Sequence, residues 1–342
     1  MQGSFDYVRG KTILVTGAAG SVGSALAETL LPHAKSVRAF DNNESELFFL
    51  HQRLSPRGSL SPQLGDIRDV DRLRYAVGGA DVIFHAAALK HVGLGEYNPF
   101  EVVQSNLVGL NNVIRAGLEA NVERVIFTSS DKAVNPTNVM GASKMMGERL
   151  IAAANEIRGW RQTRFASVRF GNVLGSRGSV VPIFVRQLRR KEPLTLTDAG
   201  MTRYVMTIRD AAELVITAGA TMKGGEVFVT KMRAVRVVDL MHAIATIAGR
   251  PTFETVVTGA RSGEKLYEEL IAVEERERAL DIGRLLVLVP PGDAMADWRA
   301  RYESATPVEK GWSSADDEYM SREDLTAYLR EHEVLTPFLE EM

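Results

Sequence analysis

The first half of the chain alternates short, continuous apolar runs with stretches in which apolar residues recur every three or four positions. Such runs are typical of strands buried on both faces of a parallel sheet, and the helical spacing indicates helices packed on that sheet. The runs predict strands over 12–16, 36–41, 63–66, 81–86, 124–129 and 164–169. The helical spacing predicts helices over 21–31, 44–54, 69–77, 99–120 and 139–158. Repeated strand–helix units of this length predict an α/β fold with a doubly wound, parallel sheet.

Beyond residue 172 the alternation becomes less regular, and short strands mix with helices. The expected strands are 203–208, 226–229, 253–257 and 285–288, and the expected helices are 210–222, 237–248 and 322–330. This mixture predicts a smaller α+β lobe that closes over the carboxyl edge of the sheet. We therefore expect a sheet domain of residues 1–172, completed by segments that return from the second half, and a lobe of residues 173–342.

Composition narrows the class of protein without naming a function. The chain has 342 residues, of which 45% are hydrophobic and 25% charged, as in ordinary globular proteins. Its formal net charge of −2 gives no electrostatic reason to expect nucleic acid as a partner. The absence of cysteine excludes disulfides, thiolate nucleophiles and Cys-ligated metals, and the histidines show no metal-binding spacing. We see no signal peptide and no apolar stretch of membrane-spanning length, and we expect a soluble, cytoplasmic protein without a metal.

A glycine-rich turn directly follows the first expected strand. Residues 17–23 read GAAGSVG, which is G-x-x-G-x-x-G opening a helix. Glycines at these positions permit a tight turn and let the backbone approach a diphosphate, whose charge the helix N-terminus stabilises. Asp41 ends the next strand, 24 positions after Gly17, where its carboxylate can accept from both hydroxyls of an adenosine ribose. The turn therefore predicts a dinucleotide site, with NAD favoured over NADP; Asp41 is alternatively an N-cap for the helix from residue 44.

Further cofactor contacts are expected at the carboxyl ends of the neighbouring strands. Asp66 and Ile67 would meet the adenine, with a helix N-cap as the alternative for Asp66, and residues 86–88, all alanine, would let backbone pass close to the cofactor. The complete expected set is Gly17, Gly20, Ser21, Val22, Gly23, Asp41, Asn42, Asp66, Ile67, Ala86, Ala87, Ala88, Lys90, Asn106, Thr128, Ser129, Lys144 and Val173.

An acid and a base stand next to each other at the end of the fifth expected strand. Asp131 and Lys132 face a helix on which Met140 and Lys144 are one turn apart and share a face. From these residues alone, the pair is either an acid/base couple or an exposed ion pair of little energetic weight. Met140 is, on the same terms, either part of a site or a core residue.

Several long motifs follow one another along residues 10–275. They are ALKHV at 88–92, SDKAVNPTNVMG at 130–141, RFGNVLGSRGSV at 169–180, MTRY at 201–204 and GARSGEKLYEE at 259–269. These motifs resemble those of the extended short-chain dehydrogenase/reductases and, more narrowly, those of the UDP-N-acetylglucosamine 4,6-dehydratases of polysaccharide biosynthesis and flagellin glycosylation. The resemblance implies a Rossmann-like sheet. In this family some members carry Met at the position of Met140 where others carry Tyr. Many of the Met type also have an N-terminal membrane region, and we expect this chain to be a stand-alone catalytic domain.

The resemblance implies an internal redox reaction on a UDP-hexosamine with tightly bound NAD that is regenerated in each turnover. Hydride leaves C4 of the sugar, C5 loses a proton, C6 loses its hydroxyl as water, and hydride returns to C6. Lys132 would be the base at C5, if burial and Lys144 lower its pKa towards neutrality. Asp131 would be the acid, kept protonated by an apolar wall that includes Met140.

Other side chains would orient the reactants. Lys144 would hold the nicotinamide ribose, and Ser130, or Thr128 and Ser129, would polarise the C4 oxygen. Because position 140 has no phenol, the proton of the 4-hydroxyl would leave through Lys132, Asp131 or water. The expected catalytic set is Ser130, Asp131, Lys132, Met140 and Lys144.

The two phosphates of a UDP-sugar need cations and backbone donors. Arg177, Arg261 and Arg203 are the expected cations, although each could instead form a structural ion pair. Thr195 would meet the uridine, and Glu264 would bind ribose or an arginine. The expected substrate set is Lys90, Ser130, Asn172, Arg177, Ser179, Val180, Val181, Thr195, Arg203, Arg261 and Glu264.

Two other functions fit parts of the pattern. A UDP-hexose 4-epimerase shares the fold, the cofactor and the oxidation at C4, but it has no use for an acid/base pair at C5 and C6 and usually relies on a Tyr at position 140. A non-catalytic NAD-binding sensor or scaffold would tolerate the missing phenol but does not need Asp131, Lys132 and Lys144. We also expect a homo-oligomer, with helices 99–120 and 139–158 forming a dimer interface.

Overall fold

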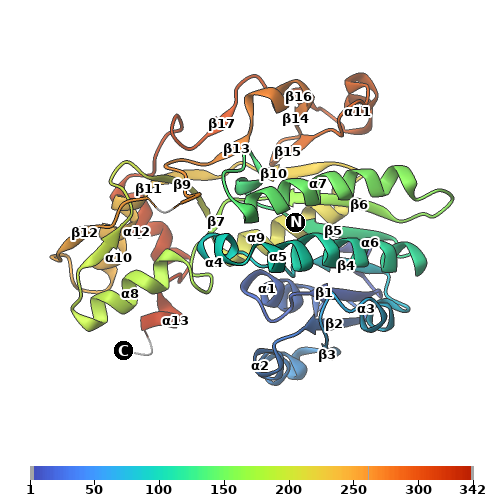
Figure 1. Cartoon of the computed structure of the whole chain (residues 1–342), viewed down its shortest axis with the longest axis horizontal. Coiled ribbons are helices and arrows are strands. Elements are labelled where there is room, and N and C mark those ends of the chain that lie inside the picture. Colours follow the sequence, from blue (N-terminus) through green and yellow to red (C-terminus); the bar gives the residue numbers. More distant parts are fainter. Residues whose placement is uncertain (1–3, 261, 340–342) are drawn as a thin grey trace.

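The protein is built around one large, twisted sheet. The computed structural model describes residues 4–260 and 262–339, and in this part of the chain the central sheet has ten strands in the order β16-β14-β15-β10-β6-β5-β4-β1-β2-β3 (Figure 1). The segment from β3 to β10 is parallel throughout. Its strands are β1 (Thr12–Thr16), β2 (Ser36–Asp41), β3 (Leu60–Leu64), β4 (Val82–His85), β5 (Arg124–Thr128), β6 (Arg164–Arg169) and β10 (Val227–Thr230). The prediction of a doubly wound, Rossmann-like parallel sheet is confirmed.

Helices cover both faces of the parallel segment, as continuous apolar strands require. One face packs against α1 (Ser21–Leu30), α2 (Glu44–Leu54) and α9 (Ile208–Thr221). The other packs against α3 (Val70–Val77), α6 (Gly109–Glu119) and α7 (Val139–Ile157). The strand order reverses between β1 and β4, and ligands of doubly wound sheets bind at this switch point, beyond the carboxyl ends of the strands.

The helix expected over 99–120 is interrupted. It consists of α5 (Pro99–Val102), a π-helical segment (Val103–Val108) and α6, and it is preceded by the unexpected short helix α4 (Val92–Tyr97). Within the π-helical segment the Asn106 amide is buried, where it donates to the Leu89 carbonyl and to Ser143 Oγ and accepts from the Leu89 N–H. π-helical segments of this kind frequently occur at functional sites. This one ties the loop after β4 to α7.

Strands from the second half of the chain extend the central sheet. β15 (Leu285–Leu288) pairs antiparallel with β10, and β14 (Ala279–Asp281) and β16 (Thr306–Pro307) follow. Strands 226–229 and 285–288 therefore do not belong to the lobe, contrary to the expectation for its strands. Their apolar residues join the core of the sheet domain, together with Trp298 on α11 (Met295–Arg301).

The smaller lobe has a separate apolar core and lies beside the carboxyl edge of the sheet (Figure 1). Its helices are α8 (Val180–Arg190), α10 (Val237–Ile247), α12 (Arg322–Glu331) and α13 (Thr336–Leu339). Short strands connect the lobe to the sheet domain: β7 (Asn172–Val173), β8 (Leu194–Leu196), β9 (Thr202–Met206), β11 (Arg233–Arg236), β12 (Thr255–Val257), β13 (Glu269–Ile271) and β17 (Trp312–Ser313). The short 3-10 segments are Asp6–Val8, Ser55–Arg57, Asp131–Ala133 and Val273–Arg278. Among the described residues, no helix combines the length and the apolar character needed to cross a bilayer.

Candidate active site

The glycine-rich turn packs directly against the end of β4. Gly17 has a φ of +67°, and a Cβ at this position would lie 2.5 Å from the Ala87 backbone nitrogen. A Cβ on Gly23 would lie 2.0 Å from the Gly17 carbonyl oxygen. Only glycine fits at either position. The N-cap of α1 is Gly20, so the first turn of this helix faces the switch point without a capping side chain.

Asp41 connects the end of β2 to the glycine-rich turn. One carboxylate oxygen accepts from the Ala19 N–H at 2.9 Å and the other from the Asn43 N–H at 2.9 Å. The N-cap of α2 is Asn43, which accepts from the Glu46 N–H. The alternative interpretation of Asp41 as the N-cap is therefore wrong, and its carboxylate helps to define the cofactor turn.

Asp66 lies beyond the strand that was expected to end with it. β3 ends at Leu64, and the N-cap of α3 is Asp69, so neither the strand-end nor the N-cap interpretation of Asp66 holds. Its carboxylate pairs with Arg68, with the closest contact at 2.7 Å, and accepts from Asn42 at 3.2 Å. These bonds, led by that from Arg68, lower the pKa of Asp66. Contact of Asp66 and of the buried Ile67 with adenine stays a prediction.

Asp131 and Lys132 lie at the carboxyl end of β5, with Asp131 buried and Lys132 partly buried. Asp131 is fully buried, and its Oδ1 accepts from Lys132 Nζ at 3.0 Å and from Ser130 Oγ at 2.8 Å. Glu268, from the distant segment before β13, approaches the same ammonium at 3.3 Å. Gly171 leaves space beside Asp131, since a Cβ there would lie 3.2 Å from Asp131 Oδ2. The alternative of an exposed ion pair is excluded by this burial.

The direction of the Lys132 pKa shift differs from the expectation. Burial acts to lower the pKa of Lys132, but the carboxylates of Asp131 and Glu268 outweigh burial, so the pKa is raised. The expectation that Lys144 would lower this pKa is wrong, because Lys144 is held elsewhere. Its Nζ donates to the Thr128 carbonyl at 2.8 Å and lies 4.7 Å from the centre of the Phe127 ring.

Lys144 itself carries the low pKa. Burial lowers its pKa from 10.5 to about 8, and Glu148 only partly opposes this shift. Met140, one turn earlier on α7, is 4% exposed. It forms part of the apolar surroundings at the start of α7, as the core alternative for this residue predicted.

The titration of Lys144 should be measurable as a pH-dependent stability. Its folded-state pKa lies below the unfolded value, so between about pH 8 and pH 10.5 the unfolded chain binds more protons and stability rises with pH. Relative to Lys144→Met, which lacks this group, the wild-type free energy of unfolding should increase by about 2 kcal/mol between about pH 7.5 and pH 9.5. Urea denaturation of both proteins measures this difference. If the free energies of unfolding of the two proteins changed equally with pH, the lowered pKa of Lys144 would be contradicted.

Two expected polarising groups point away from the acid/base pair. Ser129 Oγ donates to Glu148 at 2.6 Å, and Thr128 Oγ1 donates to the His85 carbonyl at 3.2 Å. Glu148 also pairs with the buried Arg169 at 2.7 Å. Of the hydroxyls proposed for the C4 oxygen, Ser130 alone contacts the acid/base pair, through Asp131 Oδ1.

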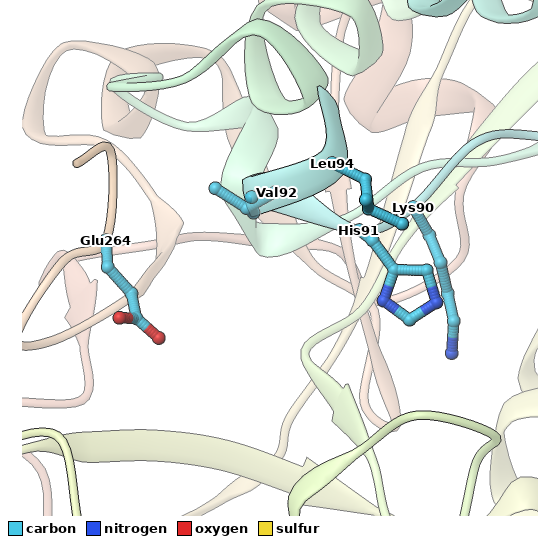
Figure 2. A pocket seen from close by; sticks show the side chains of 6 residues that line it. Lys90, His91, Val92, Leu94 and Glu264 are labelled. Atoms are coloured by element: carbon cyan, nitrogen blue, oxygen red, sulfur yellow. The ribbon is translucent and has the colours of Figure 1, made fainter. Parts of the chain in front are cut away.

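A cavity of about 340 Å³ lies next to the loop after β4. Lys90 and His91 line it from one side and Glu264 from the other (Figure 2). Lys90 Nζ donates to the Arg177 carbonyl at 2.8 Å, and burial, aided by Arg177, lowers the pKa of Lys90. The segment that carries Glu264 is held in place because Thr137 and Asn138 donate to the Gly263 carbonyl. The cavity brings together two of the expected substrate residues, Lys90 and Glu264.

Two of the expected phosphate-binding arginines, Arg203 and Arg177, have partners within the protein. The Arg203 guanidinium is buried and donates to the carbonyls of Thr202, Lys265 and Leu266. It therefore fixes the segment before Glu268, and binding of a phosphate by Arg203 stays a prediction. Arg177 pairs with Glu46, and its backbone N–H donates to Ser21 Oγ beside the glycine-rich turn. Arg261 lies outside the described residues.

The remaining expected substrate residues lie on β7, at the start of α8 and on β8. Asn172 and Val173 form β7, and the buried Oδ1 of Asn172 has no hydrogen-bond partner in the described part of the chain. Ser179 is the N-cap of α8, where Val180 and Val181 begin a helix that had not been expected. Thr195 lies on β8, and its Oγ1 accepts from Gln187 Nε2 at 2.9 Å; its contact with uridine stays a prediction.

Sequence reasoning missed the contacts of four polar residues near the site. Glu268 stood within a recognised motif, but its contact with Lys132 requires the fold. Arg169 and Glu275 likewise form an ion pair at 2.8 Å across 106 positions of sequence. His85 ends β4, where Thr16 Oγ1 lies 2.7 Å from its Nδ1, and burial lowers its pKa to about 3. Residue type and spacing give no signal of contacts over such separations.

The parallel sheet with a glycine-rich turn at its switch point defines a dinucleotide-binding protein of the extended short-chain dehydrogenase/reductase class. The family model described as "Polysaccharide biosynthesis protein" matches residues 13–290. The chain therefore belongs to this family, as its motifs predicted.

Three curated relatives show the range of names within the family. An uncharacterized membrane protein of Methanocaldococcus jannaschii is 46% identical, over 84% of this chain and 88% of that protein. An inverting UDP-N-acetylglucosamine 4,6-dehydratase of Campylobacter jejuni is 35% identical, over 95% of this chain and 96% of that protein. A UDP-glucose 4-epimerase of Rickettsia canadensis is 36% identical, over 80% of this chain and 81% of that protein. Nucleotide-sugar dehydratases and epimerases both occur among the relatives.

Two solved structures are similar over most of their lengths. Pen from Bacillus thuringiensis superposes with a TM-score of 0.90 at 36% identity, over 96% of this chain and 100% of that one. MoeE5, solved in complex with UDP-glucose and NAD, superposes with a TM-score of 0.64 at 26% identity, over 74% of this chain and 87% of that one.

Proposed function

We propose that the protein is a UDP-N-acetylglucosamine 4,6-dehydratase that uses NAD and yields a UDP-2-acetamido-2,6-dideoxy-4-keto-hexose. The observation that carries this proposal is the buried Asp131–Lys132 contact of 3.0 Å, at the carboxyl end of β5. Loss of water across C5 and C6 needs a base and an acid close together, whereas epimerisation at C4 needs neither group at C5 and C6. The Campylobacter relative named for this reaction aligns with almost the whole chain.

NAD fits the residues at the switch point. The turn has no room for side chains at Gly17 and Gly23, which leaves backbone and the first turn of α1 to receive a diphosphate. Asp41, fixed by two backbone N–H groups, would accept from the adenosine ribose, and its charge would repel the 2′-phosphate of NADP. When bound, NAD supplies the acceptor for hydride from C4 and the donor for its return to C6. MoeE5, which was solved with NAD and UDP-glucose, supports this choice of ligands.

The side chains around the pair have separable roles in this proposal. Lys132 removes the proton at C5, and Asp131 protonates the departing 6-hydroxyl. Ser130 orients Asp131 through its hydrogen bond of 2.8 Å. Lys144, fixed on the Thr128 carbonyl, holds the nicotinamide ribose near the sugar. Lys90 and Glu264 bind the nucleotide sugar from opposite sides of the cavity.

Incubation of the purified protein with UDP-N-acetylglucosamine and NAD tests the proposal by mass spectrometry. A dehydratase gives a product that is lighter by one water. An epimerase leaves the mass unchanged and alters the sugar, and a non-catalytic sensor returns the substrate. UDP-glucose is tested as a second substrate. An epimer of unchanged mass, or unchanged substrate, would contradict the dehydratase proposal. The epimerase is the second candidate because a relative of 36% identity carries that name.

A further inference from the structure

Glu268 places a second carboxylate on the ammonium of Lys132. The Glu268 side chain is 2% exposed, and its Oε1 lies 3.3 Å from Lys132 Nζ. On the other side, Asp131 Oδ1 lies 3.0 Å from the same nitrogen. Lys132 therefore bridges two buried carboxylates that are 137 positions apart in the sequence.

The position of Glu268 is fixed through its backbone. Its N–H donates to Ser314 Oγ at 2.9 Å, and the Ser314 N–H donates to its carbonyl at 2.8 Å. Arg203 donates to the carbonyls of Lys265 and Leu266, shortly before Glu268 in the sequence. Its Nε is 3.9 Å from Glu268 Oε1. The contacts with Ser314 involve the main chain of Glu268, and Arg203 Nε lies 3.9 Å from the carboxyl group. These contacts therefore leave the carboxyl group able to exchange a proton.

One oxygen of each carboxyl group lacks a hydrogen-bond partner. Glu268 Oε2 and Asp131 Oδ2 are both buried and unpartnered within the described residues. Buried polar atoms without partners are costly, and in native proteins they call for an explanation such as a catalytic role. A proton on Glu268 would remove one of the two like charges.

The charges that face Glu268 favour a bound proton. Burial raises the pKa of Glu268, Lys132 opposes the rise, and Asp131 reinforces it, with Arg203 and Lys265 as further opposing cations; the net direction is upward. Two close carboxylates on one site commonly share a proton in this way.

We infer that Glu268 is a positioning residue that acts through Lys132, by holding one proton of the Asp131–Lys132–Glu268 cluster during dehydration. This inference rests on the proposed function. With Glu268 neutral, the proton on Lys132 Nζ can pass to Asp131 Oδ1: an N–H bond breaks and an O–H bond forms. The transfer yields a neutral amine and a protonated carboxyl group together.

Both groups are then consumed in the elimination. The amine of Lys132 takes the proton from C5, and the proton of Asp131 leaves with the 6-hydroxyl as water, so the number of protons balances. With Glu268 ionised, its negative charge holds the proton on Lys132, and the base is lost. This explains how Lys132 can serve as a base although its pKa is raised.

The test is the pH dependence of dehydration by Glu268→Gln, whose amide remains neutral at every pH. Lys144 titrates in both proteins, so the informative quantity is the ratio of the variant kcat to the wild-type kcat. We expect this ratio to rise with pH over the range in which both proteins stay folded, by up to about tenfold per pH unit once Glu268 ionises in the wild type. KM for the nucleotide sugar should change little. A ratio that stays constant over this range would overturn the inference.

Two further variants keep the test decisive. Glu277→Gln makes the same change at an exposed carboxyl on the 3-10 segment Val273–Arg278, and its ratio should be one at every pH. Glu268→Asp keeps a carboxyl group with a lower ordinary pKa, so it should move the alkaline fall of kcat to lower pH. If kcat of Glu268→Asp fell at the same alkaline pH as kcat of the wild type, the inference would also be overturned. If the wild-type protein formed no dehydrated product, the proposed function itself would be rejected. Failure of the proposed function and failure of the inference about Glu268 can therefore be told apart.

Discussion

Lys132→Met is expected to lower the rate of UDP-N-acetylglucosamine dehydration by about 10³-fold or more. The substitution removes the base at C5, and general acid–base groups typically contribute about 10²–10⁴-fold to a rate. Asp131→Asn, which keeps the shape of the side chain but cannot deliver a proton from a carboxyl group, should cause a loss of similar size. Both buried carboxylates around Lys132 lose their cation in the first variant, so kcat should be measured together with the free energy of unfolding.

The control for this prediction is Lys35→Met, an identical change at an exposed lysine. Its kcat should match the wild type. In the Lys132 and Asp131 variants, KM should change far less than kcat, because the lost interactions belong to the transition state. Turnover within threefold of wild type in both folded variants would show that these side chains do not perform the elimination.

Arg169→Met is expected to reduce the free energy of unfolding by about 3–5 kcal/mol, the usual result of removing one partner from a buried ion pair. Arg169 is 1% exposed and binds Glu148 at 2.7 Å and Glu275 at 2.8 Å. Burial acts to lower the pKa of Arg169, but these two carboxylates raise it overall. Without the guanidinium, the buried Glu148 carboxylate would lose its cation, and Glu275 would keep, within the described residues, only its ion pair with Arg278.

Urea denaturation measures this effect, and Arg9→Met provides the matched control. Arg9 pairs with Asp6 on the surface, where both side chains are more than half exposed, so its loss should cost less than about 1 kcal/mol. Equal effects of the two substitutions would contradict the role given to the buried network. Because Glu148 also binds Ser129, two residues before Asp131, the Arg169 variant should also lose activity.

The parallel half of the fold could be predicted because its signals are local. β1, β2 and α2 have the bounds that apolar runs and helical spacing predicted, and the glycine-rich turn lies between β1 and α1 as its spacing required. Spacing alone does not say which sheet a strand joins, so β10 and β15 were assigned to the lobe. The π-helical interruption at Val103–Val108 depends on contacts of Asn106 with Leu89 and Ser143, which helical periodicity does not contain.

The chemistry of the site was only partly accessible for the same reason. Asp131 and Lys132 are adjacent in sequence, and their contact follows from that adjacency. The pKa of Lys132 is raised because the carboxylates of Asp131 and Glu268 together outweigh burial, and the contact with Glu268 is one that only the fold reveals. Arg203 appeared to be a free cation in the sequence, whereas the fold buries it against backbone carbonyls.

Transfer of an isotope label tests the central claim most directly. UDP-N-acetylglucosamine carrying deuterium at C4 is incubated with the protein, and the product is examined by NMR and mass spectrometry. Our account predicts that the label appears at C6 of a product that has lost one water. Deuterium that stays at C4, whether in unchanged substrate or in an epimer of the same mass, would contradict it.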